Sequence, residues 1–144
     1  MRVTIKGDCR TFTTADQTKI EQRIRALVKG ICDAHGATAL VDYHNEFIPL
    51  MNTAREVSIA SSAARSVVGA ELVDDDCALI TASEDFAQFL QVVPGCYLDI
   101  GNGITGSCGS SLHNNTYDFN DEILTIGASF YRQVVASELG PLSA

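Results

Sequence analysis

Basic residues are scarce in this chain of 144 residues. Lys and Arg together number 10, against 18 Asp and Glu, which gives a formal net charge of -8. A protein that follows a phosphate backbone needs clustered Lys and Arg, and here these residues are scattered. The composition therefore argues against a nucleic-acid partner and predicts an acidic surface.

Long apolar runs are also missing. No window of about 18 consecutive apolar residues occurs, and the opening sequence MRVTIKGDCR lacks the apolar stretch and small-residue cleavage site of a signal peptide. We therefore expect a cytoplasmic protein that does not enter a membrane. With 46% hydrophobic residues the chain can still fill a core, so it is not a disordered tail.

The cysteines form no Cys-x-x-Cys pair. Their number is odd, and without a secretion signal we expect free, mostly buried thiols rather than disulfides. The five positions are Cys9, Cys32, Cys77, Cys96 and Cys108.

Histidine occurs only three times, and one copy lies in an unusual loop. His113 belongs to SSLHNNTYDFND, residues 110–121, which follows the glycine- and serine-rich stretch GNGITGSCGSS. A loop histidine among polar residues could bind a metal, transfer a proton, cap a helix or face solvent. A catalytic zinc needs about three protein ligands, and Cys108 and Cys96, like the other histidines, His35 and His44, lack a recognised metal spacing.

Other candidate groups have equally ordinary explanations. Ser107, Cys108 and Ser110 could act as nucleophiles near His113, but no Gly-x-Ser-x-Gly elbow frames them. The paired carboxylates Glu84 and Asp85 of SEDF suit general acid and base work, or simply the first turn of a helix capped by Ser83.

The first part of the chain predicts a strand, a helix and a strand. Alternating apolar residues from Val3 to Thr11 and from Ala39 to Phe47 are typical of half-buried strands. Between them Thr14 and Gln17 form a capping-box pattern ahead of an apolar stripe that Gly36 can close. So small a layer leaves sheet edges unpaired, and we expect another element or chain to complete it. On the polar side of the first strand, Arg10 could clamp a carboxylate or face solvent.

After Pro49 the order becomes helix, strand, helix, strand, helix, which is typical of an α/β layer. Thr53 and Glu56 begin a helix that Gly69 ends, ALIT and CYLDIG are the strands, and Ser83 precedes a short helix. A closing helix covers residues 121–139, with Asn120 as its cap. The fold class predicted from these patterns is α/β (α+β), with a boundary near residue 50.

Three stretches together carry a family resemblance: GDCRTF, SEDFAQFLQVVPGCYLDIGNG and SLHNNTYDFNDEILTIGASFYRQVV. They resemble the carboxyl-terminal part of the metal-dependent aminoacylase and carboxypeptidase-like amidohydrolases, in particular the hippurate hydrolases and N-acyl-amino-acid amidohydrolases. The resemblance implies that residues 1–50 match part of a ferredoxin-like lid and dimerisation domain. Residues 51–144 match the last segment of a zinc-peptidase-like catalytic domain.

The resemblance also implies roles for individual residues. His113 matches a metal ligand, and Arg10 matches an anchor for the substrate carboxylate. Gly101, Asn102 and Gly103 match a wall of the substrate pocket, while Glu84 and Asp85 lie near the chemistry. Intact relatives use a pair of zinc, manganese or cobalt ions, but their Asp-x-His motif, remaining ligands and glutamate base have no counterpart in this sequence.

We therefore expect no catalytic residue of that mechanism and no tightly bound metal in the isolated chain. The expected function is that of one part of an enzyme that hydrolyses N-acyl amino acids, inactive alone and completed by an amino-terminal portion. The alternative is an interaction module that keeps the fold of this region and forms a homodimer through a strand edge. A small thiol or zinc protein using Cys96, Cys108 and His113 is a third hypothesis.

Overall fold

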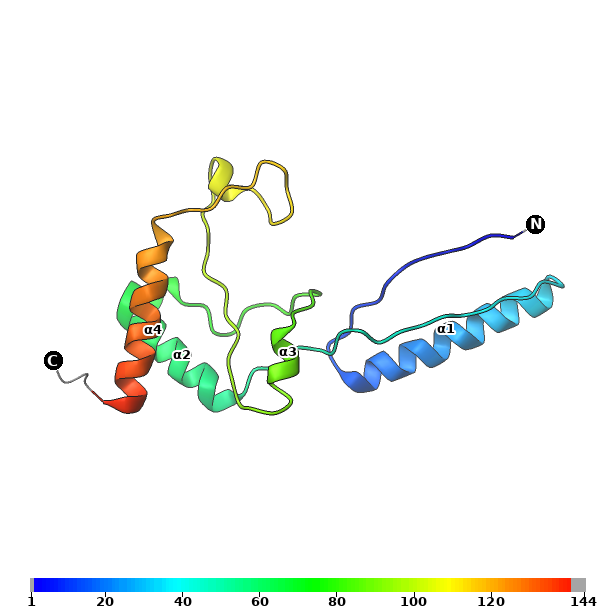
Figure 1. The fold of residues 1–144 in the computed structure, drawn as a ribbon, viewed down its shortest axis with the longest axis horizontal. Coiled ribbons are helices and arrows are strands. Elements are labelled where there is room, and N and C mark those ends of the chain that lie inside the picture. Colours follow the sequence, from blue (N-terminus) through cyan, green and yellow to red (C-terminus); the bar gives the residue numbers. More distant parts are fainter. Residues whose placement is uncertain (1, 141–144) are drawn as a thin grey trace. The chain divides into compact units, whose positions relative to one another are not determined.

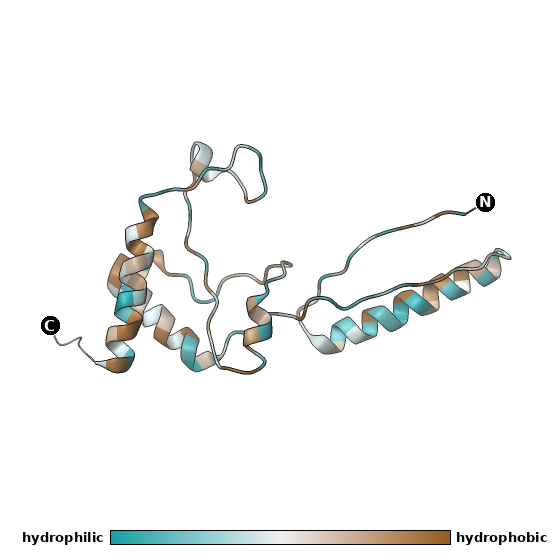
Figure 2. Cartoon of the chain, viewed as in Figure 1, coloured by the Kyte–Doolittle hydropathy of each residue, from teal (hydrophilic) through white to brown (hydrophobic). Residues whose placement is uncertain are grey.

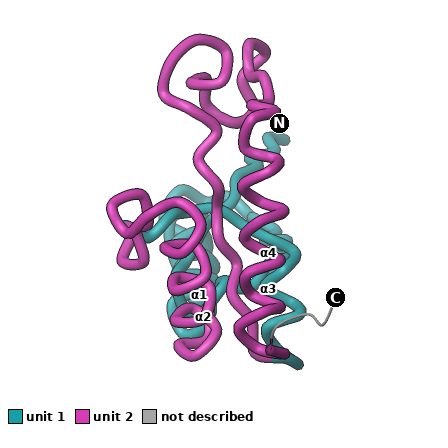
Figure 3. Tube along the Cα trace, turned by 90° about the vertical axis from the view of Figure 1, so that its left-hand side faces the viewer, with its two compact units in different colours: residues 1–51, 78–93 teal, residues 52–77, 94–144 magenta. Residues whose placement is uncertain are grey.

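The computed structural model describes residues 2–140 and contains helices joined by long extended segments (Figure 1). The chain divides into two compact units, residues 1–51 with 78–93 and residues 52–77 with 94–144 (Figure 3). Whether these units correspond to the predicted lid and catalytic segments stays a prediction. In chain order the helical elements are α1 (Thr14–Ala34), α2 (Ala54–Val68), η1 (Ala70–Leu72), α3 (Phe86–Phe89), η2 (Ser107–Gly109) and α4 (Ile123–Leu139).

Helix α1 lies where the apolar stripe predicted it, but its cap is one residue earlier than expected. The Thr13 side chain accepts a hydrogen bond from the backbone N–H of Asp16, at 3.0 Å, and satisfies one free donor of the first turn. Gln17, predicted to belong to the cap, instead donates from Nε2 to the Phe47 carbonyl. The helix ends before Gly36, whose φ of 64° suits a residue without a Cβ.

The predicted strand, helix and strand of the first unit is wrong: no strand occurs among residues 2–140. Residues 37–47 are extended, but helix side chains take carbonyls that a strand partner would need, with Arg25 donating to Val41 and Gln17 to Phe47. Burial raises the pKa of the Tyr43 phenol, and the neighbouring Cys9 thiol adds to the shift, so the two extended segments meet near these residues. These two segments form no ladder of backbone hydrogen bonds. Alternating apolar residues predict which side of a strand is buried, but they do not provide a second strand to pair with it.

The α/β class predicted for residues 51–144 is wrong for the same reason. The expected strand CYLDIG is extended but has no partner strand in the described part of the chain. The side chain of Asn52 makes the backbone hydrogen bonds that a neighbouring strand would make. Asn52 Oδ1 accepts from the Tyr97 N–H, and Asn52 Nδ2 donates to the Tyr97 carbonyl, both at 2.8 Å. Next to it, the backbone N–H of Thr53 donates to the Gly95 carbonyl at 3.0 Å. Two residues thus reproduce the hydrogen bonds of a short bridge without forming a sheet.

Helices α2 and α4 pack against each other and form the centre of the second unit (Figure 1). Ala63 of α2 and Phe130 of α4 are buried, as is the Ser61 hydroxyl-bearing side chain. At the edge of the pair, Arg55 binds Glu138 with a nitrogen to oxygen distance of 2.7 Å. Small residues on α2 let the two helices approach, so this helix pair is the scaffold of the unit.

Many large apolar side chains of residues 2–140 are exposed. Figure 2 shows where apolar residues lie along the chain. Leu27 and Ile31 of the α1 stripe are 62% and 61% exposed, and Leu40 of the extended segment after α1 is 94% exposed. The first unit therefore presents apolar side chains of the kind that proteins usually bury.

The cysteines are all free thiols, as predicted, but the expectation that most are buried is wrong. Cys9 and Cys77 are exposed and the other three are half-buried. Within residues 2–140, no helix combines the length and the hydropathy needed to cross a bilayer.

Candidate functional site

The predicted site residues fall in both units. Arg10, Glu84 and Asp85 belong to the first unit, whereas His113 and the Gly101–Gly103 wall belong to the second. Each group is therefore described within its own unit.

The structure brings Arg10 close to the SEDF segment. Arg10 and Ser83 line the same small cavity of about 20 Å³, together with Gln17 and Phe47. One guanidinium nitrogen lies 3.2 Å from a carboxylate oxygen of Asp8. Arg10 thus has a carboxylate partner already, in an exposed pair that contributes little to stability and that another carboxylate could displace.

Glu84 and Asp85 lie directly before α3, so the prediction that they form the first turn of this helix is wrong. Asp85 occupies the cap position without a side-chain bond to the helix, and the Glu84 carbonyl accepts from the backbone N–H of Ala87 at 3.2 Å. Glu84 is half-buried and Asp85 exposed. The Ser83 cap predicted from sequence is absent, because the helix begins two residues later than that cap requires.

The middle residue of the glycine-rich wall, Asn102, has a fully engaged side chain. Asn102 Nδ2 donates to the carbonyls of Cys108 and Asp118, at 2.9 and 2.7 Å, and Oδ1 accepts from the N–H of Asn120 at 2.8 Å. Gly103 follows with a φ of 148°, and a Cβ there would lie 3.1 Å from that of Cys108. The loop can close this tightly only because residue 103 is glycine.

His113 is exposed and has a left-handed backbone, with a φ of 64°. It is the one non-glycine residue with positive φ between residues 2 and 140. Such a conformation is costly for a residue with a Cβ, and it persists where the surrounding contacts hold it. Next to it, Asn114 Oδ1 accepts from both the backbone N–H and the hydroxyl of Thr116, each at 2.9 Å.

A complete metal site does not fit the described residues. No group of three His, Cys, Asp or Glu side chains within residues 2–140 is placed to hold a metal ion. His113 alone offers one imidazole, whereas a catalytic site needs about three protein ligands. No chemical step through a metal can therefore be derived from this chain.

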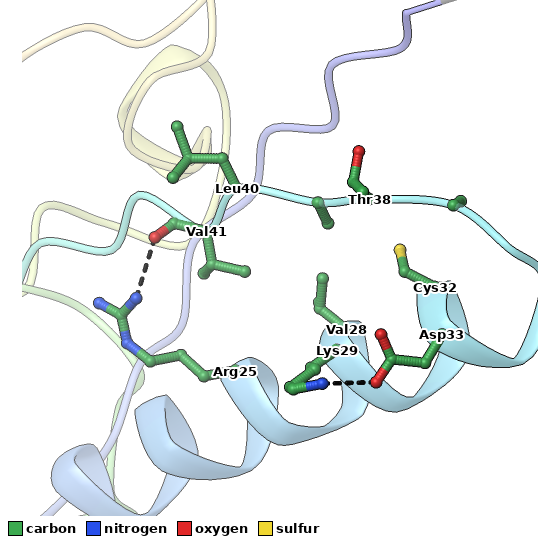
Figure 4. A pocket seen from close by; sticks show the side chains of 10 residues that line it. Arg25, Val28, Lys29, Cys32, Asp33, Thr38, Leu40 and Val41 are labelled. Carbon is green, nitrogen blue, oxygen red and sulfur yellow. Dashed lines mark hydrogen bonds and ion pairs between the residues drawn. The ribbon is translucent and has the colours of Figure 1, made fainter.

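A further hollow lies between α1 and the extended segment 37–41 (Figure 4). Its volume is about 450 Å³, and none of the predicted site residues lines it. Its two basic side chains are engaged: Arg25 donates to the Val41 carbonyl and pairs with Glu21, and Lys29 pairs with Asp33. The hollow therefore lacks an unpaired charge for an anionic substrate.

Sequence reasoning missed the residues that hold the His113 loop. Asn120 was expected only as a helix cap. That cap is wrong, because α4 begins at Ile123 with Glu122 in the cap position. Asn120 Oδ1 accepts from the Glu122 N–H at 3.1 Å ahead of the helix, and Asn120 Nδ2 donates to the Asn102 carbonyl at 3.0 Å. No local pattern marks two asparagines so far apart in sequence as partners.

The amino-acid sequence of this chain matches a known family. The family model described as Peptidase family M20/M25/M40 matches residues 5–137. The chain belongs to this peptidase family. The resemblance to metal-dependent aminoacylase and carboxypeptidase-like amidohydrolases is thereby confirmed, and members of the M20/M25/M40 family generally use divalent metals.

Curated relatives in the M20/M25/M40 family are similar over most of this chain. A hippurate hydrolase of Campylobacter jejuni is 27% identical over 136 residues, which are 94% of this chain and 34% of that protein. The putative amidohydrolase YhaA of Bacillus subtilis is 29% identical over 128 residues, 85% of this chain and 31% of that protein. The N-acetyl-L-cysteine deacetylase of Bacillus subtilis is 33% identical over 99 residues, 69% of this chain and 23% of that protein.

The chain thus spans about a third of the length of the hippurate hydrolase and of YhaA. No solved structure gives a significant match to it.

Proposed function

We propose that this chain is one part of a metal-dependent amidohydrolase that cleaves the amide bond of N-acyl amino acids, and that it is inactive alone. The observation that carries the proposal is the family match over residues 5–137, combined with a coverage of only about a third of the relatives. The remaining ligands of a zinc, manganese or cobalt pair, and the general base, would come from residues outside this sequence.

The proposal gives His113 the role of one metal ligand. An imidazole at the tip of an exposed loop can bind an ion that other residues hold from the opposite side, and its second nitrogen remains available to an acceptor. When bound, such an ion pair would polarise the scissile carbonyl and activate water. The loop's own contribution would be to hold the imidazole where the ion needs it.

The proposal gives Arg10 the role of anchor for the substrate carboxylate. A guanidinium can bind a carboxylate through two parallel hydrogen bonds, which fixes both position and orientation. Its exposed contact with Asp8 would be exchanged for the substrate. Glu84 and Asp85 would lie near the chemistry, and Gly101, Asn102 and Gly103 would form a wall whose backbone N–H groups face the substrate.

The test is a complementation assay with hippurate and an N-acetyl amino acid as substrates. The purified 144-residue chain is assayed alone and after mixing with a polypeptide that supplies the other two thirds of a relative's length. We expect turnover only in the mixture, and the His113→Ala variant should abolish nearly all of it because a ligand is lost. Turnover by the chain alone, or a mixture insensitive to His113→Ala, would refute the proposal.

Asn115→Ala is the matched control for that variant. Asn115 lies two residues from His113, is exposed and makes no side-chain hydrogen bond within residues 2–140. It should therefore retain the activity of the mixture.

The exposed apolar residues of the first unit favour a second candidate function, an interaction module that pairs with another copy of itself. Leu40 and Ile5 are 94% and 92% exposed. This second function would be supported over the first if the chain alone forms a homodimer, if Leu40→Asp dissociates that homodimer, and if the same substitution leaves the activity in the complementation assay unchanged. A monomer at all accessible concentrations would contradict it.

A further inference from the structure

We propose that Asn102 and Asn120 form a reciprocal clamp whose side chains position His113 instead of contacting the substrate. The inference rests on the proposed function for the task of His113, but the clamp itself rests on contacts within the second unit. Its two residues lie at the two ends of the segment 103–119, which contains the histidine loop.

The clamp is built from bonds in both directions. Asn102 Oδ1 accepts from the backbone N–H of Asn120, and Asn120 Nδ2 donates to the backbone carbonyl of Asn102. Asn102 Nδ2 uses its two hydrogens on the carbonyls of Cys108 and Asp118. Both donor hydrogens of the Asn102 amide are thus committed inside the protein, and its oxygen already has a donor.

The chemistry of the partners fixes the orientation of the Asn102 amide. Backbone carbonyls only accept and a backbone N–H only donates, so exchanging Oδ1 and Nδ2 would break all three bonds. A carboxylate in place of the amide would keep the acceptor for Asn120 but would face two carbonyl oxygens without a donor. Asparagine is therefore the residue type that satisfies all three partners at once.

Inside the clamp, two further closures lead toward His113. The backbone N–H of Asp118 donates to the Ser107 carbonyl at 3.4 Å. Nearer the tip, the hydroxyls of Ser110 and Thr116 lie 2.9 Å apart and are hydrogen-bonded. The loop is thus cross-linked at its base, middle and neck, and the histidine lies beyond the last link.

The hydrogen bonds of the loop hold the backbone of His113 in its left-handed conformation. A left-handed histidine returns to ordinary backbone conformations unless its surroundings prevent it. The cross-links shorten the free segment around it, and the clamp ties the base of the loop to α4, because Asn120 Oδ1 also accepts from the Glu122 N–H. Since α4 packs on α2, this bond holds the base of the loop in a fixed position relative to the helix pair that forms the scaffold of the second unit.

The test measures backbone order and hydrogen exchange by NMR on the full 144-residue chain. In the unsubstituted protein we expect an order parameter of about 0.85 at His113, falling below about 0.6 in both Asn102→Ala and Asn102→Asp. Exchange at the Asn120 amide should accelerate about tenfold in Asn102→Ala, which removes its acceptor, and stay near the original rate in Asn102→Asp. Asn115→Ala should change neither quantity.

Amides of α4, such as that of Phe130, report whether each variant is folded. If Asn102→Ala unfolds, Asn102→Asp carries the test, because it predicts a disordered His113 beside a protected Asn120 amide. An unchanged order parameter at His113 in a folded Asn102 variant would overturn the clamp. A disordered His113 in these variants supports the clamp even if the complementation assay shows no hydrolysis, so the two proposals fail separately.

Discussion

The packing of α2 on α4 leads to a prediction about one buried ring. Phe130 retains 8% of its surface exposed, whereas the adjacent Tyr131 retains 70%. The two rings also touch edge to face, with centroids 5.4 Å apart. Phe130→Ala should therefore destabilise the second unit strongly, and Tyr131→Ala, next to it on the same helix, should not.

The magnitude follows from the buried area. A phenylalanine side chain presents about 200 Å², and most of this area leaves water when Phe130 packs. At about 25 cal/mol per Å², and after subtracting what alanine still buries, the loss is roughly 3 to 4 kcal/mol. For Tyr131→Ala the exposed position limits the loss to about 1 kcal/mol.

Urea unfolding followed by far-ultraviolet circular dichroism measures the difference. With a slope of about 1.5 kcal/mol per molar urea, Phe130→Ala should lower the midpoint of the unfolding transition by about 2 M. The slope itself should not change. Equal midpoints for the two variants would refute the assignment of Phe130 to the core of the helix pair.

Two further predictions concern titrating groups around Thr53. The hydrogen bond from the Thr53 hydroxyl, and secondarily Arg55, lowers the pKa of Glu56 below its ordinary value of 4.5. The ionised Glu56 therefore stabilises the folded state fully above pH 4.5, and this stabilisation is lost as the pH falls through the lower pKa of the folded state. Thr53→Ala should therefore lower the free energy of unfolding, measured by urea titration, by more at neutral pH than in acid. A difference between the two proteins that does not change with pH would contradict this. Burial, aided by the Glu56 carboxylate, raises the pKa of the Cys96 thiol. Iodoacetamide at pH 8 should therefore modify the exposed Cys77 several times faster than Cys96, as measured by mass spectrometry. Equal modification rates would contradict this protection of Cys96.

Local patterns predicted the helices well. The apolar stripe and the terminal glycine placed α1, and Thr53 with Gly69 bounded α2 correctly. These signals work because helix hydrogen bonds join residues four positions apart, so the information lies within the same segment. The errors at the ends are small: α1 is capped by Thr13, and α4 begins at Ile123.

The strands could not be predicted from alternation alone. A strand is completed by hydrogen bonds from another segment, and the alternating residues carry no information on where that segment lies. In this chain, side chains of α1 bind the carbonyls of Val41 and Phe47, and the amide of Asn52 binds the backbone of Tyr97. Residues 37–47 and the segment CYLDIG thus bind side chains instead of a neighbouring strand, which no period-two pattern reveals.

The candidate site shows the same limit at the level of single residues. Motif resemblance selected His113 because a ligand's residue type can be read from sequence, and the same motif attached Asn102 to the substrate wall. The hydrogen bonds instead engage the Asn102 side chain with Cys108, Asp118 and Asn120, which lie 6 to 18 positions away. A side chain that must satisfy three backbone groups at once tolerates less substitution than one that faces solvent. A motif can therefore retain an asparagine for the loop it closes as well as for a ligand it touches, and only the contacts distinguish the two roles.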